Sequence, residues 1–177
     1  SLPRVNDQER ALSLVGTTAE LRFRPVCGIS DKARPETAAS GSWIGTHAKC
    51  SDVWSGAVVP ATGINGYTTP EDDLADQFVV LGLRDGSSGQ RYLLGPSVLT
   101  GEAIAEANPL FIDYQWQVGL DLHQGKVGID GFNEVAGLCY SGSPSCPRTE
   151  GSLNGRLAIV LDGQVVTAPS IRAPEFR

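Results

Sequence analysis

Two histidines and four cysteines are the side chains of this 177-residue sequence that are best suited to catalysis or metal binding. Nucleophilic catalysis needs a base beside the nucleophile, and only His47 and His123 could supply an imidazole. The sequence contains neither the G-x-S-x-G pattern of a nucleophile elbow nor the lysine-bearing glycine loop that binds phosphates. We therefore expect no catalytic residue, no cofactor and no resident metal.

The four cysteines form two pairs of close neighbours in the sequence, which are Cys27 with Cys50 and Cys139 with Cys146. Because short loops close at the lowest entropic cost, we predict disulfides within these pairs rather than either of the other two connectivities. The chain-entropy model gives the longer loop about 3.4 kcal/mol and the shorter about 2.5 kcal/mol. The alternative is a zinc site of Cys27, His47 and Cys50, for which no fourth ligand is evident. Disulfides predict an oxidising, extracytoplasmic setting.

The overall composition excludes several classes of protein. Acidic residues number 20 against 14 basic ones, a net charge of −6, whereas a nucleic-acid partner requires a basic face. The longest apolar run, residues 157–161, is far shorter than the roughly 20 residues of a membrane span. No methionine occurs, even at position 1, so we expect the chain to be a piece of a larger protein.

Hydrophobic periodicity predicts an α+β fold, with a mixed or antiparallel sheet and helices packed on one face. Alternating or continuous apolar patterns predict strands near residues 19–24, 115–122, 157–161 and 164–168. Asp162-Gly163 separates the last two and favours a type I′ hairpin turn. Capping and spacing signals predict helices over residues 6–15, over 100–108 with Thr100 as the cap, and from Asp130 to about Cys139.

Residues 27–91 are predicted to form a disulfide-tied, loop-rich insert, with one strand at residues 78–83. Proline, glycine, serine and threonine are scattered through it, a pattern typical of irregular structure. We interpret Trp43 and Trp54 as buried anchors of these loops. The alternative is a sugar-stacking surface of Trp43, Trp54 and Tyr67, as in an extracytoplasmic carbohydrate-binding module or enzyme.

Five blocks of sequence are similar, in order, to segments of one family. The blocks are residues 2–11 (LPRVND followed by RA), residues 16–24 (GTTAELRFR), residues 99–107 (LTGEAIAEA) with residues 128–136 around Phe132, and residues 157–171 (LAIVLDGQVVTAPSI). Together they resemble the SecD family, the membrane-embedded accessory subunit of the bacterial Sec translocase. Arg4 stands where that family commonly has glycine.

The resemblance implies a domain organisation. Residues 1–18 would end a base subdomain and connect it to residues 19–172, the head of the first extracytoplasmic (P1) domain. Residues 27–91 would be a lineage-specific insert, and residues 173–177 a tail that is either native or left by cloning.

The resemblance also implies a function without catalysis. The head would contact unfolded preprotein emerging from the Sec channel and, with SecF, hinder its backsliding. The parent protein would lie in the cell membrane, with this part on the extracytoplasmic side, and the proton-motive force would act through membrane helices.

Overall fold

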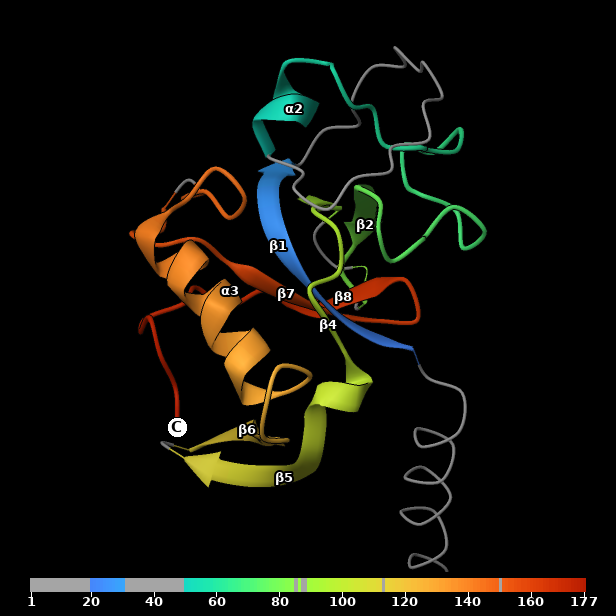
Figure 1. Cartoon of the computed structure of the whole chain (residues 1–177). Helices are drawn as coiled ribbons and strands as arrows, with labels where there is room; N and C mark the ends of the chain where they lie inside the picture. The colour runs from blue at the N-terminus through green and yellow to red at the C-terminus, as the bar shows by residue number, and fades with distance from the viewer. Residues whose placement is uncertain (1–19, 31–49, 85, 87–88, 113, 150) are drawn as a thin grey trace, which may run out of the picture.

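A computed structural model describes residues 20–30, 50–84, 86, 89–112, 114–149 and 151–177 (Figure 1). Its elements in chain order are β1 (Leu21–Ser30), α2 (Cys50–Trp54), β2 (Val79–Gly82), β3 (Arg91–Leu94), β4 (Leu99–Thr100), a 3-10 turn η1 (Gly101–Ala103), β5 (Ile104–Ile112), β6 (Gln115–Leu122), α3 (Ile129–Ser141), β7 (Leu157–Leu161) and β8 (Gln164–Thr167). The helix predicted over residues 6–15 lies outside the described residues. The α+β fold class is confirmed, although its helices are few.

The main sheet has the strand order β2-β3-β1-β7-β8, with β4 also paired to β1, and all its ladders are antiparallel. The first and last strands of this order also meet. Leu83, just beyond β2, forms a parallel bridge with Val165 of β8, and the backbone N–H of Arg84 donates to the carbonyl of Val165 (2.9 Å). The sheet therefore curls toward closure, which shields two edges that could otherwise pair with another chain.

Strand β1 is longer than the predicted strand over residues 19–24. Pro25, which lacks an N–H, does not end it: Pro25 pairs with Leu157, and its carbonyl accepts from the N–H of Gly95 (2.9 Å). A bulge between Val26 and Gly28 follows, and the strand changes partner from β7 to β3. The bulge lets one strand serve both halves of the sheet.

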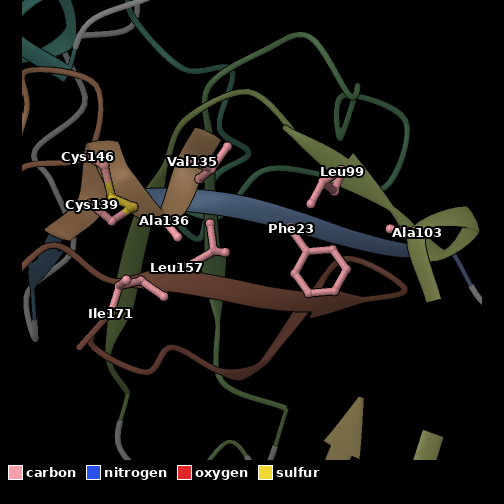
Figure 2. Packing of buried hydrophobic residues seen from close by; sticks show 9 residues of the cluster. All are labelled: Phe23, Leu99, Ala103, Val135, Ala136, Cys139, Cys146, Leu157 and Ile171. Atoms are coloured by element: carbon pink, nitrogen blue, oxygen red, sulfur yellow. A yellow bond between two sulfur atoms is a disulfide. The ribbon is translucent and has the colours of Figure 1, made fainter. Parts of the chain in front are cut away.

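Both faces of the sheet are packed. One face meets α3 in a cluster whose buried members are Phe23, Leu99, Ala103, Val135, Ala136, Cys139, Cys146, Leu157 and Ile171 (Figure 2). The other face encloses a second cluster, made of Val26, Val79, Leu81, Tyr92, Leu94, Ala158, Val160 and Val165. Neighbouring β7 residues therefore enter different clusters, as the alternation of side chains in a strand requires. This two-sided burial explains why residues 157–161 are apolar without interruption.

The predicted hairpin at the C-terminal end is confirmed. Strands β7 and β8 pair across a two-residue turn in which Asp162 (φ 48°) and Gly163 (φ 74°) both have positive φ. The side chain of Asp162 also accepts from the backbone N–H of Glu20 (2.9 Å), so the turn holds the chain as it enters β1.

The helix predicted over residues 100–108 is wrong. Thr100 precedes a single 3-10 turn and makes no side-chain cap, and the chain then enters the nine-residue strand β5. Strand β5 pairs antiparallel with β6 along its whole length, from Ile104 opposite Leu122 to Ile112 opposite Gln115. Pairing with the strand that follows directly after a two-residue turn therefore overrides the helical propensity of this segment.

Helix α3 is confirmed and ends at Gly142, whose left-handed conformation (φ 69°) lets its N–H bond to the carbonyls of Leu138 and Cys139. Cys139 lies on the core-facing side and is bonded to Cys146 (S–S 2.02 Å). Cys27 is bonded to Cys50 (1.97 Å), so the pairing is the one predicted.

The short helix α2 was not predicted. It begins at Cys50, and its residues Cys50 and Val53 pack with Cys27, Val58 and Phe78 in a third buried cluster. The N–H of Cys50 donates to the carbonyl of Pro144 (3.0 Å), so the two disulfide-bonded loops meet. Strands β2 and β3 also show that the later part of the predicted insert enters the main sheet. The domain boundaries at residues 18 and 172 and the insert over 27–91 stay predictions.

Candidate functional site

The residues considered for catalysis and metal binding do not come together. His123 is exposed in the loop after β6, and His47 lies outside the described residues. Cys27 and Cys50 are joined to each other, so neither offers zinc a thiolate. Within the described ranges, no three histidine, cysteine, aspartate or glutamate side chains are grouped as metal ligands.

The most buried charges form a cluster between β1 and the loop that precedes β2. The guanidinium groups of Arg22 (3.0 Å) and Arg24 (2.9 Å) both donate to Oδ1 of Asp73. The Arg24 side chain is fully buried, and the Arg22 and Asp73 side chains are about 10% exposed or less. Arg24 also donates to three backbone carbonyls, those of Leu74, Gln77 and Gly95. The cluster therefore fastens a loop that has little secondary structure to the central strand.

Burial lowers the pKa of Arg24 from its usual value to about 10, because the loss of hydration outweighs the attraction of Asp73. The group still carries its charge at neutral pH. Such a cation is stable inside the protein only with its counterion and carbonyl partners in place. The cluster is closed on itself, which indicates a structural role.

The aromatic residues considered for sugar stacking are not assembled by the described structure. Trp43 lies outside the described residues, as does the side chain of Trp54. Tyr67 lines a pocket of about 300 Å³ beside Gly82, but the guanidinium of Arg91 covers its ring, 4.6 Å from the centroid. The described structure therefore offers no open aromatic platform at Tyr67.

Strands β5 and β6 form a separate two-stranded sheet, here called the arm (residues 104–122), at the end of the molecule opposite α2 (Figure 1). Its base is anchored, because Ile104, Leu120 and Leu122 pack against the cluster between the main sheet and α3. Its tip is exposed: Tyr114, in the turn with φ 59°, is 95% exposed, and Phe111 is 57% exposed. The arm thus presents aromatic surface on a firmly held support.

The arm is also acidic. Residues 101–122 include four acidic residues and neither lysine nor arginine. Two of the acids, Glu106 and Asp121, are directly opposite each other across the β5–β6 ladder, and both are exposed. Like charges opposite each other destabilise a strand pair.

Replacing Glu106 by glutamine is therefore expected to raise the free energy of unfolding by about 0.2–1 kcal/mol, measured by urea denaturation at low salt. The matched control is Glu102→Gln, which removes the same charge from an exposed position of the 3-10 turn, outside the ladder. An equal change in the free energy of unfolding for the two substitutions would show that the pairing of Glu106 with Asp121 does not destabilise the ladder.

The sequence did not reveal the arm as a site, because its first strand was predicted as a helix. Two signals were available: the alternation over residues 115–122, and Pro109, which would interrupt a longer helix. An antiparallel partner for residues 115–122 had to lie nearby, and residues 104–112 are the segment one turn before it.

The comparisons with known proteins concern this same part of the chain. Residues 78–175, which include the arm, match the family model described as SecDF, P1 head subdomain. A comparison with curated proteins found no match. In the described residues, no helix has the length and apolar character needed to cross a membrane.

Two solved structures are similar to the chain, each with 27% identity over 98% of it. One is titled as SecDF in a super-membrane-facing form, with a TM-score of 0.44, and the chain spans 17% of its length. The other is titled as a membrane component SecDF that enhances protein export, with a TM-score of 0.42, and the chain spans 60% of its length. The family match covers more than half of the chain, and the chain therefore belongs to the SecDF P1 head subdomain family.

Proposed function

We propose that this chain is the extracytoplasmic head of a SecDF-type subunit, where it binds preprotein emerging from the Sec channel. In this proposal the head holds the polypeptide weakly, without catalysis, while the parent protein works with SecF in export driven by the proton-motive force. The family membership supports the setting. Two disulfides support a location in an oxidising compartment.

The exposed tip of the arm is the observation on which the proposed binding rests. Tyr114 is almost fully exposed at the end of a hairpin whose base is packed into the core. An aromatic side chain can contact apolar groups of many sequences without a specific pocket, as a protein that holds unfolded chains requires. The anchored base would transmit any movement of the head to the bound segment.

Site-specific photo-crosslinking in the full-length protein tests this function. A photoreactive phenylalanine analogue at Tyr114 is expected to give an adduct with a stalled secretory chain. The matched control is the same analogue at Ile64, which is 98% exposed but lies in the loop between α2 and β2. The absence of an adduct from Tyr114, or an equal yield from Ile64, would contradict the proposal.

A further inference from the structure

We propose that the outer edge of β6 takes an extended segment carrying lysine or arginine as a third strand of the arm. This inference rests on the proposed function and specifies how the exported polypeptide is held. It follows from three features of the arm: the direction of its backbone groups, the position of its proline and the sign of its charge.

The register fixes which backbone groups point outward. Ile112 and Gln115 flank a two-residue turn, so they form a hydrogen-bonded pair, and the pairs alternate along the ladder from there. The next non-hydrogen-bonded pairs are Phe111 with Trp116, Pro109 with Val118 and Ala107 with Leu120. In such pairs the N–H and C=O of both residues point away from the partner strand. Pro109 agrees with this register, because its nitrogen has no hydrogen to give to β6.

The two outer edges of the arm are therefore not equivalent. On β5 the middle outward position is Pro109, which cannot donate to an added strand. On β6 the outward positions are Trp116, Val118 and Leu120, and each has an N–H and a carbonyl. In the part of the chain that the structure describes, β6 pairs only with β5, and no other backbone hydrogen bond uses its residues. The edge of β6 is thus the one suited to strand addition.

The negative charge of the arm indicates which kind of segment would bind at this edge. Asp121 lies on β6 itself, directly opposite Glu106, and neither has a cationic partner among the described residues. A strand added beside β6 would place its own side chains next to Asp121, and a lysine or arginine there would relieve the opposed carboxylates. An acidic segment would add to the repulsion. The segment that suits the edge of β6 is therefore an extended one that carries both cationic and apolar side chains.

Proline substitution tests the edge directly. Val118→Pro removes an outward N–H from β6, and Ala107→Pro removes one from β5, and both spare the β5–β6 ladder. In the full-length protein with the photoreactive residue at position 114, Val118→Pro is expected to lower the adduct yield about fivefold to tenfold. The control Ala107→Pro is expected to keep the wild-type yield. A wild-type yield from Val118→Pro, or equal losses from both, would overturn the inference.

A peptide titration provides a second measurement that does not depend on folding of a proline variant. The probes are an alternating Val/Lys peptide, the same peptide methylated on alternate backbone nitrogens, and a Val/Glu version. The unmethylated Val/Lys peptide is expected to bind at least tenfold more tightly than either of the others. The variant Glu106→Gln with Asp121→Asn should narrow the preference for lysine over glutamate. Equal affinity for the methylated peptide would mean that side chains alone are recognised and would overturn the inference.

These outcomes separate the inference from the proposed function. If the adduct yield at position 114 is unchanged by Val118→Pro, the proposed function stands and strand addition at β6 is ruled out. The absence of any adduct in the wild-type protein would remove both.

Discussion

Replacing Asp73 by asparagine is expected to lower the free energy of unfolding by about 3–5 kcal/mol. Asp73 is the shared counterion of Arg22 and Arg24, whose side chains are 9% and 0% exposed. Asparagine keeps the shape but removes the charge. Arg24 then keeps only its backbone carbonyl partners, and Arg22 keeps the exposed carboxylate of Glu20, so neither guanidinium has a buried counterion. For a chain of this size, the melting temperature should fall by about 10 °C.

The matched control for this experiment is Asp76→Asn, which makes the same charge change three residues away. Asp76 is exposed. Thermal melting followed by circular dichroism should show little change for the control, within about 0.5 kcal/mol. Equal melting temperatures for Asp73→Asn and Asp76→Asn would show that the arginines do not depend on their carboxylate.

The second large effect is expected from the disulfides. Replacing Cys27 and Cys50 together by alanine should lower the free energy of unfolding by about 3.4 kcal/mol, and the same change at Cys139 and Cys146 by about 2.5 kcal/mol. The difference arises because the first bridge closes a loop of 23 residues and the second a loop of 7. Both bridges are buried, so the lost packing of sulfur adds to each value. Urea denaturation under oxidising conditions measures both double variants.

The wild-type protein in reductant is the control for the disulfide variants. Reduction should bring its stability close to that of a variant lacking both bridges, because the same constraint on the unfolded chain is removed. If the variant at Cys139 and Cys146 lost more stability than the variant at Cys27 and Cys50, loop closure would not be the main contribution. The same conclusion would follow if each variant were still less stable than the wild-type protein by the same amount when both are measured in reductant.

The elements predicted correctly from the sequence are those whose signals are local. The turn at Asp162-Gly163 demands two positive φ values, and the apolar positions from Phe132 to Cys139 follow the helical period, so both were recognised. Nearest-neighbour pairing of cysteines succeeded for the same reason. In each case, one segment contains all the information needed.

The elements that were missed depend on contacts with another segment of the chain. Residues 104–112 have helical propensity, and only the ladder with β6 makes them a strand. The strand predicted over residues 19–24 continues past Pro25, because the bulge after Val26 lets β1 pair with β3 beyond its pairing with β7. The arm was not recognised as a candidate site because its first strand was predicted as a helix, and the edge of a hairpin can be identified only when both strands are known. The counterion Asp73 was likewise indistinguishable in the sequence from its exposed neighbours.

The direction of the strands has a mechanical consequence. Strand β1 is antiparallel to β7, and β7 is antiparallel to β8, so the chain enters at the start of β1 and leaves β8 at the opposite end of the sheet. Tension between these two points pulls the outer strands of this trio in opposite senses along their length. Hydrogen bonds that run perpendicular to the strands are then sheared together instead of being unzipped one by one. The trio β1, β7 and β8 is therefore arranged to resist force applied along its strands, and the two-stranded sheet of β5 and β6 lies outside this trio.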